Sequence, residues 1–357
     1  MVTLKQVAAR AGVSPATVSR VLSGAGQVQP EYRERVLRAA AELGYRPNRL
    51  ASSLRRRKTE KIGIVVSDIE NPHFTQMVRV VEDAAYHRGY RVLLCNTDEL
   101  ADKQRAYLHV LADERVEGVI LAPADPAGAG IAELLGMGIP IVAFDRAVDD
   151  QRADAVVADN AGGARRATEL LLDAGHTRIG FVGGREEIQT GRQRRAGYED
   201  AMRRRQATAP SVEDGGFRID GGEAATYRLL DADPRLSALV VANNLMAVGA
   251  FRALRARGLH VPDDVAFVTI DDPYWASLVD PPLTALAQPV DGMARAAVDL
   301  LFERIEGNRT TPRSVVFSFD LRLRASCGTA TPRYQPPCLA SPERQPALTL
   351  STRPLPS

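Results

Sequence analysis

Residues 14–23 carry side chains suited to contact with a polyanion. Ser14 can accept hydrogen bonds from the first free amides of a helix, and Pro15 suits the first helical position. A helix that begins there turns Val18, Val21 and Leu22 inward. The residues left outside are Pro15, Ala16, Thr17, Ser19 and Arg20. Small and hydroxyl side chains allow close approach to phosphates, and one arginine can donate two hydrogen bonds to a guanine edge. The pattern predicts a helix that contacts the major groove of DNA.

A second set of side chains with binding chemistry follows short apolar runs farther along the chain, at 62–66, 139–144, 178–182, 239–242 and 265–270. Carboxylates, amides and guanidinium groups accept from and donate to sugar hydroxyls, and an aromatic ring, from Phe74 or Trp275, covers the sugar face. Loop Asp and Asn residues also cap helices, so no single residue indicates a ligand site. The clustering of these residues at several strand ends does indicate a ligand site. Its predicted members are Asn71, His73, Phe74, Asp145, Arg146, Thr190, Arg194, Asn243, Asp271 and Gln288.

Three amphipathic stretches must position the first set. Thr3 and Gln6 have the spacing of a capping box, and the helix that they begin ends at a tight turn over 12–13. A third stretch runs from Pro30 to residue 44, with an inward stripe of Val36, Leu37, Ala40 and Leu43. Residues 1–46 are therefore predicted to form an all-α helix-turn-helix head. A three-helix protein-interaction module is the alternative.

Charge favours DNA binding by this head. Residues 1–60 contain 12 Lys and Arg against 4 Asp and Glu, a net charge of +8, whereas the whole chain has 46 against 44. Residues 61–357 therefore have 34 against 40, a net charge of −6. Basic side chains gathered in one segment neutralise phosphates and release counterions. The head is predicted to bind DNA and the body to do something else.

The linker at 47–60 and the tail at 328–357 differ from the rest in composition. In the linker, Asn48 can cap a two-turn helix with Leu50 and Leu54 on one face, too short to be stable alone. Basic residues beside exposed leucines can insert an apolar wedge into a minor groove, although a solvated tether has the same composition. The tail holds seven prolines and is predicted to be disordered.

From Lys61 the chain alternates short apolar runs with amphipathic stretches, a pattern typical of parallel α/β sheets. The series repeats after Asp159. This predicts a body over 61–327 with two α/β lobes: lobe 1 at 61–158 and 289–317, and lobe 2 at 159–287 and 318–327. Open α/β sheets bind ligands at the carboxyl ends of their strands, so a ligand is expected between the lobes.

Composition excludes several other classes. A length of 357 with 45% hydrophobic and 25% charged residues is ordinary for a multidomain protein. No apolar run reaches about 20 residues and no leader pattern is present, so a cytoplasmic protein without a membrane partner is expected. Scattered cysteines and histidines predict no metal site. An enzyme with a DNA-binding head is disfavoured because the chain lacks GxxxxGK[ST] and a dinucleotide fingerprint, so no cofactor is expected.

As a set, the motifs resemble the LacI family of bacterial transcriptional repressors over residues 3–326. In the head they are Thr3-Leu4-Lys5-Gln6-Val7-Ala8, Gly12-Val13-Ser14, Thr17-Val18-Ser19-Arg20 and Gly44-Tyr45-Arg46-Pro47-Asn48. In the body they are Val116-Glu117-Gly118, Asp159-Asn160, and Asp271-Asp272 before Pro281-Pro282-Leu283-Thr284.

This resemblance implies a homodimer on a pseudo-palindromic operator, with positions 15, 16 and 20 contacting bases and Leu54 entering the central minor groove. The implied DNA-binding set is Thr3, Ser14, Pro15, Ala16, Thr17, Ser19, Arg20, Asn48, Ser53, Leu54 and Arg55. A proline-rich tail cannot form the leucine-heptad helix of tetrameric relatives, so a dimer is expected.

The body is similar to ribose-type periplasmic sugar-binding proteins, with a two-lobed, type I fold. Their sugar-contacting positions match Asn71, Phe74, Asp145, Arg146, Arg194, Asn243, Asp271 and Gln288. The chain departs at His73, where an aromatic ring is usual, and at Asn244, where Asp is usual; Phe217 is a further candidate for the aromatic plate. The resemblance implies a repressor controlled by a small, pentose-like monosaccharide. A nucleoside or purine stacked on Phe74 is the alternative.

Overall fold

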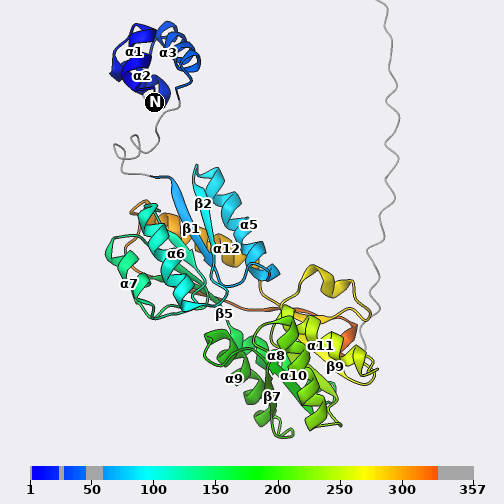
Figure 1. The fold of residues 1–357 in the computed structure, drawn as a ribbon. Helices are drawn as coiled ribbons and strands as arrows, with labels where there is room; N and C mark the ends of the chain where they lie inside the picture. The colour runs from blue at the N-terminus through cyan, green and yellow to red at the C-terminus, as the bar shows by residue number, and fades with distance from the viewer. Residues whose placement is uncertain (1, 24–27, 46–58, 329–357) are drawn as a thin grey trace, which may run out of the picture. The chain divides into compact units, whose positions relative to one another are not determined.

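The structure is a computed structural model that describes residues 2–23, 28–45 and 59–328. The chain divides into two compact units, Met1–Glu60 and Lys61–Ser357, drawn in Figure 1. The predicted hinge helix, with Asn48, Ser53, Leu54 and Arg55, lies outside the described residues, and so does the proline-rich tail.

The first unit contains three helices, α1 (Leu4–Ala11), α2 (Pro15–Ser23) and α3 (Pro30–Glu42). The predicted capping box is present at the start of α1, where Thr3 and Gln6 bond each other's backbone amides. Gly12 follows with a φ of +63°, a left-handed conformation that glycine adopts without strain. The prediction for Leu37 was wrong: it is 50% exposed, and the inward stripe of α3 is Val36, Ala39 and Ala40.

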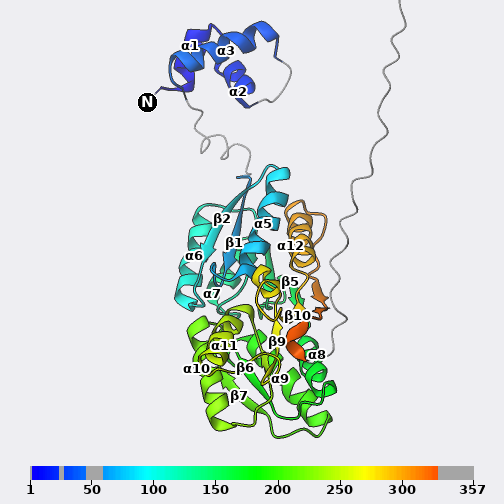
Figure 2. The ribbon, with the colours of Figure 1, turned by 90° about the vertical axis from the view of Figure 1, so that its right-hand side faces the viewer.

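The second unit begins with lobe 1, a six-stranded parallel sheet in the order β11-β5-β4-β3-β1-β2. Its strands are β1 (Lys61–Val66), β2 (Arg91–Asn96), β3 (Val119–Leu121), β4 (Ile141–Asp145), β5 (Asp154–Ala158) and β11 (Ser314–Phe317). Its helices are α5 (Pro72–His87), α6 (Ala101–Asp113), α7 (Ala129–Gly136) and α12 (Val290–Ile305). Figure 2 shows these helices around the sheet.

Lobe 2 has a second six-stranded sheet, in the order β12-β10-β9-β8-β6-β7, parallel except at the β10/β12 pair. Its strands are β6 (Ile179–Gly183), β7 (Ser211–Asp214), β8 (Ala238–Val241), β9 (Ala266–Ile270), β10 (Thr284–Ala287) and β12 (Asp320–Arg322). The helices are α8 (Asn160–Asp173), α9 (Gln189–Arg204), α10 (Ile219–Ala232) and α11 (Asn244–Ala256), with short 3₁₀ turns η1 (Tyr274–Ser277) and η2 (Ala325–Cys327).

The central strand β1 illustrates why lobe 1 has helices on both faces. Ile62, Ile64 and Val66 pack in the core that contains the inner faces of α5 and α12, whereas Val65 packs with α6 and α7. Alternation along a strand sends successive side chains to opposite faces, so a run of apolar residues requires cover on both. The two-lobed α/β architecture predicted from the sequence is confirmed.

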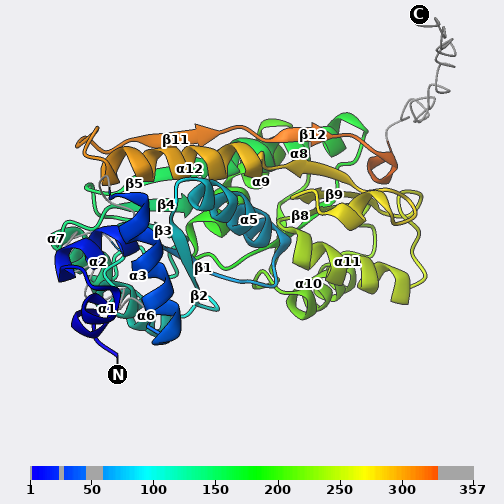
Figure 3. The same ribbon diagram turned by 90° about the horizontal axis from the view of Figure 1, so that it is seen from above.

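Three segments connect the lobes: β5 continues into α8, β10 continues into α12, and β11 continues into β12. Figure 3 shows the last of these passing from one sheet to the other. The carboxyl ends of β1, β4, β6, β8 and β9 lie at the junction between the two lobes. The loops that follow these strands therefore approach one another. This topology brings together side chains that lie up to about 200 residues apart in sequence.

Candidate functional site

The outward face of α2 contains the predicted DNA-contacting residues of the head. Pro15, Ala16 and Arg20 are exposed, while Thr17 and Ser19 are half-buried. Ser14 Oγ accepts a hydrogen bond from the Thr17 backbone N–H (3.1 Å), which satisfies one free amide at the start of the helix. The inward stripe packs on the other helices, with Val18 fully buried. The helix therefore presents small side chains and one guanidinium outward, as the sequence predicted.

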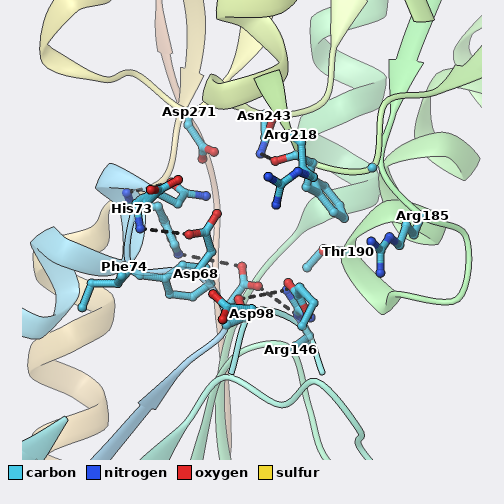
Figure 4. A pocket seen from close by; sticks show the side chains of 18 of the residues that line it. Asp68, His73, Phe74, Asp98, Arg146, Arg185, Thr190, Arg218, Asn243 and Asp271 are labelled. Carbon is cyan, nitrogen blue, oxygen red and sulfur yellow. Dashed lines mark hydrogen bonds and ion pairs between the residues drawn. The ribbon is translucent and has the colours of Figure 1, made fainter. Parts of the chain in front are cut away.

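The second candidate site is a cavity of about 330 Å³ between the two lobes (Figure 4). Of the predicted ligand residues, all ten line it: Asn71, His73, Phe74, Asp145, Arg146, Thr190, Arg194, Asn243, Asp271 and Gln288. Each belongs to a strand end or to the first turns of the helix that follows. Trp275 does not line the cavity, whereas Phe217 does, so the aromatic alternative to Phe74 is Phe217.

On the lobe 1 side, Arg146 is bound by the protein itself. Its Nη1 and Nη2 each lie 2.7 Å from an oxygen of Glu99, and Nε lies 3.2 Å from Asp145 Oδ2. Nη1 also donates to Pro123 O (3.2 Å) and Nη2 to Ser67 Oγ (3.5 Å). Burial alone would lower the pKa of this guanidinium, but its hydrogen bonds and charge pairing with Glu99 outweigh burial and raise the pKa. Arg146 therefore stays charged and fully hydrogen-bonded.

Beside Arg146, a buried polar group has no partner. His73 Nε2 makes no hydrogen bond within the described residues and lies 3.8 Å from Asp145 Oδ1. The His73 ring meets Phe74 edge-on, with centroids 5.1 Å apart. An unpaired buried nitrogen is costly unless a ligand or water satisfies it. The two atoms are too close for a hydroxyl to fit between them, but a hydroxyl beside the pair could contact both.

Asp271 and Gln288 form a polar pair at the far end of the cavity. Gln288 Nε2 donates to Asp271 Oδ1 (2.8 Å) and lies 3.4 Å from His73 Nδ1. Gln288 Oε1, like His73 Nε2, is buried without a partner among the described residues. Asp271 has a left-handed φ of +70°, and Asp145 one of +68°, conformations that are rare for a non-glycine residue and common at functional sites.

On the lobe 2 side, Arg194 is held by neutral groups. Its Nε donates to Asn160 Oδ1 (2.7 Å) and its Nη1 to Ala242 O (2.6 Å). Within the described residues no hydrogen bond of Nη2 is seen, and the side chain lines the cavity together with Thr190. A guanidinium that is fixed at two nitrogens and open at the third is a ready hydrogen-bond donor for a ligand.

Asn243 has a structural role as well as a place in the wall. Its Oδ1 accepts from the Met246 N–H (2.8 Å) and caps α11, and its Nδ2 lies 3.5 Å from Phe217 O. Phe217 packs so closely over Gly184 that a Cβ on Gly184 would lie 2.0 Å from its ring. A glycine at 184 therefore permits the aromatic ring to lie flat at the cavity.

Among the described residues, two hydrogen bonds join lobe 1 to lobe 2 in addition to the contact of Gln288 with His73. Asn244 Nδ2 donates to Asn71 Oδ1 (3.0 Å), and the Ala147 N–H donates to Gln189 Oε1 (2.9 Å). Asn71 Oδ1 also accepts from the His73 N–H and so caps α5. Asn244 bonds to Asn71 and does not line the cavity. The presence of Asn at position 244, where Asp is usual in the similar sugar-binding proteins, therefore affects the contact between the lobes.

The cavity has further charged residues of opposite sign on its two sides (Figure 4). Lobe 1 contributes Asp68, Glu70 and Asp98, and lobe 2 contributes Arg185 and Arg218. Burial raises the pKa of the Asp68 carboxyl above its ordinary value, although the positive charge of Arg218 acts in the opposite direction.

Several residues of this site were not predicted from the sequence. Glu99, Ser67, Arg185 and Arg218 line the cavity but were not predicted to bind ligand. Glu99 follows the end of β2, so the same rule of polar residues after apolar strands could have found it. Arg218 follows β7, an edge strand whose sequence is too polar to be recognised as a strand.

The described part of the chain has neither a cluster of metal ligands nor a membrane-spanning helix. No group of three or more histidine, cysteine or acidic residues there could hold a metal ion. No helix there has the length and apolar character needed to cross a membrane.

The sequence matches two family models. Residues 3–48 match the model of bacterial regulatory proteins of the lacI family, and residues 168–327 match the periplasmic binding protein-like domain. The first match covers the helix-turn-helix head, and the second covers most of lobe 2 and the return to lobe 1.

Individual proteins are similar over nearly the whole chain. A ribose operon repressor of Halalkalibacterium halodurans is 36% identical over 306 residues, which cover 86% of this chain and 91% of the relative. The structure of a CelR–cellobiose complex is 36% identical with a TM-score of 0.69, covering 91% of this chain and all of that one. The Lac repressor dimer bound to operator and the anti-inducer ONPF is 30% identical with a TM-score of 0.81, covering 91% and 99%. By these similarities, the chain belongs to the lacI family of bacterial transcriptional regulators.

Proposed function

We propose that this repressor binds a pseudo-palindromic operator as a homodimer and that a pentose-like monosaccharide in the cavity controls the binding. The observation that carries the proposal is a pair of buried polar atoms on residues that line one small cavity, His73 Nε2 and Gln288 Oε1, which have no partner among the described residues. The Arg194 guanidinium lines the same cavity and bonds the protein through Nε and Nη1. Buried polar atoms are normally hydrogen-bonded, and a ligand with several hydroxyl groups would supply the hydrogen bonds that the protein does not make here.

Size and shape favour a small ligand. The cavity of about 330 Å³ is at the lower end of the roughly 300 to 1,000 Å³ range of ligand pockets. Phe74 and Phe217 supply apolar surfaces, and carboxylates and one guanidinium supply acceptors and donors. A sugar ring has the matching composition, because its hydroxyls lie around the edge and its C–H groups on the faces.

The similar proteins support this class of effector and a DNA target. One relative is named a ribose operon repressor, one solved structure holds cellobiose, and another is a dimer bound to operator. All are transcriptional regulators, which supports a regulator over an enzyme. As a repressor of bacterial genes, the protein would act in the cytoplasm, without a membrane partner.

The proposed DNA interface combines α2 with the linker. In the head it comprises Thr3, Ser14, Pro15, Ala16, Thr17, Ser19 and Arg20, and in the linker, on sequence grounds alone, Asn48, Ser53, Leu54 and Arg55. Pro15 and Ala16 offer no polar side-chain atom, so Arg20 should make most of the polar base contacts.

Exposed apolar side chains on the body support the homodimer. Tyr86 on α5 is 72% exposed, and Tyr274 and Leu278 at η1 are 79% and 77% exposed. A homodimer interface that covers both lobes would bury these side chains and remove their apolar surface from water. Sedimentation equilibrium of the full chain should give twice the monomer mass; a monomer at micromolar concentration would contradict the proposal.

Calorimetry tests the effector. D-Ribose, D-xylose and D-glucose represent the monosaccharides, cellobiose a disaccharide, and adenosine and hypoxanthine the alternative class. A pentose should bind most tightly. Tightest binding by cellobiose or by a purine would contradict the proposed class, and turnover of any compound would indicate an enzyme.

Binding to inverted-repeat duplexes selected from random sequence tests the DNA interface. Arg20→Ala should weaken operator binding by about 1 to 3 kcal/mol and relax specificity at one base pair in each half-site. Arg56→Ala is the matched control, because a phosphate contact should weaken binding to all sequences alike. If both variants lose affinity uniformly, Arg20 does not contact a base.

Effector and operator should also be coupled. A regulatory ligand changes operator affinity by a factor that corresponds typically to about 1 to 3 kcal/mol, and operator changes ligand affinity by the same factor. Equal sugar affinity with and without operator would remove the regulatory role.

A further inference from the structure

Glu99 binds Arg146 at the place where a ligand would otherwise contact it. Both carboxylate oxygens of Glu99 lie 2.7 Å from the two terminal nitrogens of Arg146, in the parallel arrangement that arginine also adopts with phosphate groups. Glu99 itself lines the cavity, and its side chain is 18% exposed. The Arg146 side chain also lines the cavity but is only 5% exposed, so Glu99 covers most of the guanidinium on this side.

The loop between β2 and α6 holds Glu99 in this position. Asp98 and Glu99 both have left-handed φ values, +52° and +59°, which non-glycine residues rarely adopt in succession. The loop is fixed by the Glu99 N–H, which donates to Ser67 O (3.1 Å), and by Asn96 Nδ2, which donates to Asp98 Oδ1 (2.6 Å). Lys103 forms an ion pair with the same Asp98 carboxylate. An unfavourable backbone conformation that persists in this way is imposed by its surroundings.

The pairing changes what this wall of the cavity offers a ligand. Every N–H of Arg146 has an acceptor within the protein, so the wall presents the remaining lone pairs of Glu99 and Asp145. Carboxylate oxygens accept hydrogen bonds from hydroxyl groups and repel anions.

The charged side chains that line the cavity have an excess of negative charge. Six carboxylates line it against four guanidinium groups: Asp68, Glu70, Asp98, Glu99, Asp145 and Asp271 against Arg146, Arg185, Arg194 and Arg218. Arg194 alone among the two inner arginines keeps a donor for ligand. An anionic ligand would therefore add negative charge to a cavity that already has an excess of it.

We propose that Glu99 sets the charge class of the effector: its carboxylate takes the place of an anionic ligand group against Arg146. The cavity then accepts neutral polyhydroxy compounds and excludes sugar phosphates and sugar acids. The proposal rests on the proposed function for the neutral sugar, whereas the exclusion of anions by Glu99 can be tested without knowing the effector.

The first experiment uses inorganic phosphate and thermal shift on the full chain. Phosphate should not stabilise the wild-type protein through the cavity, but Glu99→Ala exposes two Arg146 nitrogens and should bind phosphate at least about tenfold more tightly. Glu99→Asn is the second variant, because asparagine tolerates a left-handed φ and its side chain is too short to reach Arg146. Glu99→Gln removes the charge but keeps the volume, so it should gain little.

Glu70→Ala is the matched charge control, since it removes a carboxylate from the same cavity without touching Arg146. An equal gain of phosphate affinity in Glu70→Ala and Glu99→Ala would overturn the proposal, because it would reduce the effect to net charge. So would the absence of any gain in Glu99→Ala and Glu99→Asn.

The second experiment compares D-ribose with D-ribose 5-phosphate by calorimetry. Wild type should prefer the neutral sugar, and Glu99→Ala should shift the ratio of the two affinities toward the phosphate by about tenfold or more. A Glu99→Ala variant that binds D-ribose more tightly would identify Glu99 as a competitor of the sugar and overturn the proposal. If wild type binds neither compound while Glu99→Ala gains phosphate, the pentose assignment fails and the role of Glu99 stands.

Discussion

The two walls of the cavity hold an arginine in opposite ways. Arg146 on the lobe 1 side is surrounded by charge, from Glu99 and Asp145, and every N–H is used by the protein. Arg194 on the lobe 2 side is held by two neutral acceptors, Asn160 and Ala242, and keeps Nη2 open toward the cavity. Arg146 therefore has a structural, or framework, role in the lobe 1 wall, and Arg194 is available to bind a ligand.

This difference shows that lining a cavity and binding its ligand are separate properties. Lobe 1 presents mainly acceptors, because its positive charge is neutralised before a ligand arrives. Lobe 2 presents a charged donor. A ligand with hydroxyl groups can donate to one wall and accept from the other, so the two walls are complementary to the same neutral molecule.

Replacing the framework arginine should have the largest effect. Arg146→Met leaves Glu99 and Asp145 partly or fully buried without their cation, so we expect the free energy of unfolding to fall by about 3 to 5 kcal/mol. Urea denaturation monitored by circular dichroism measures this. The double variant Arg146→Met/Glu99→Leu should recover part of the loss, because removal of both partners leaves fewer unpaired charges. A loss below about 1 kcal/mol in the single variant would contradict a framework role.

A buried tyrosine hydroxyl in lobe 2 should make the stability of the protein depend on pH above about 10. Tyr198 is fully buried, donates to Ile179 O (2.6 Å) and stacks on Phe181. Burial raises its pKa to about 12. Since the unfolded tyrosine loses its proton near pH 10, the unfolded state is favoured as pH rises from about 10 to 12.

The loss through this group should reach about 2 kcal/mol by pH 12, since a shift of one pKa unit corresponds to about 1.4 kcal/mol and the folded tyrosine is half ionised at that pH. Urea unfolding at a series of pH values measures it. Tyr198→Phe keeps the ring and removes the titrating hydroxyl, so its stability should depend less on pH above 10. Identical pH profiles for the two proteins would contradict the role of Tyr198.

Replacing the ligand-facing arginine should mainly change binding. Arg194→Met removes the open donor, and a hydrogen bond to a charged group contributes about 1.5 to 3 kcal/mol, so effector affinity should fall by roughly 10- to 150-fold. Calorimetry with the sugar that binds wild type measures the change. Its stability should change less than that of Arg146→Met, since Arg194 leaves behind only neutral acceptors. A larger loss of stability than of affinity would place Arg194 in the framework as well.

The sequence could predict which residues meet in the cavity, but not which of them bond to each other and which remain open to a ligand. Strand ends and helix starts follow from hydrophobic periodicity, and the carboxyl ends of parallel strands must lie together, so Asp145, Arg194 and Asp271 were correctly placed in the cavity. The contact between Glu99 and Arg146 was not predictable. It depends on two successive left-handed residues, a conformation that no local pattern around Asp98 indicates.

The missing elements of the fold have a similar explanation. The strands β7, β11 and β12 are sheet edges with polar or exposed residues, and β5 and β10 are rich in alanine, so none has the run of bulky apolar residues that indicated β6, β8 and β9. The helix α12 was missed as an element, although its residues were assigned to lobe 1. The error on Leu37 has another cause: periodicity indicates one face of a helix, but the width of the buried stripe depends on how two other helices pack against it.

The smallest expected effect is at the contact between the walls. Asn244→Asp replaces an N–H donor with a carboxylate that faces Asn71 Oδ1 at the site of a 3.0 Å hydrogen bond. The Asn71 amide cannot simply turn over to donate, because its Oδ1 also accepts from the His73 N–H and caps α5. Either the bond between lobes or the helix cap is lost, and each is worth about 1 kcal/mol, which corresponds to roughly fivefold in effector affinity. Calorimetry on Asn244→Ala should give this loss, and Asn244→Asp should lose more because its buried carboxylate faces an acceptor oxygen. Unchanged affinity in both variants would mean that the two walls close without this contact.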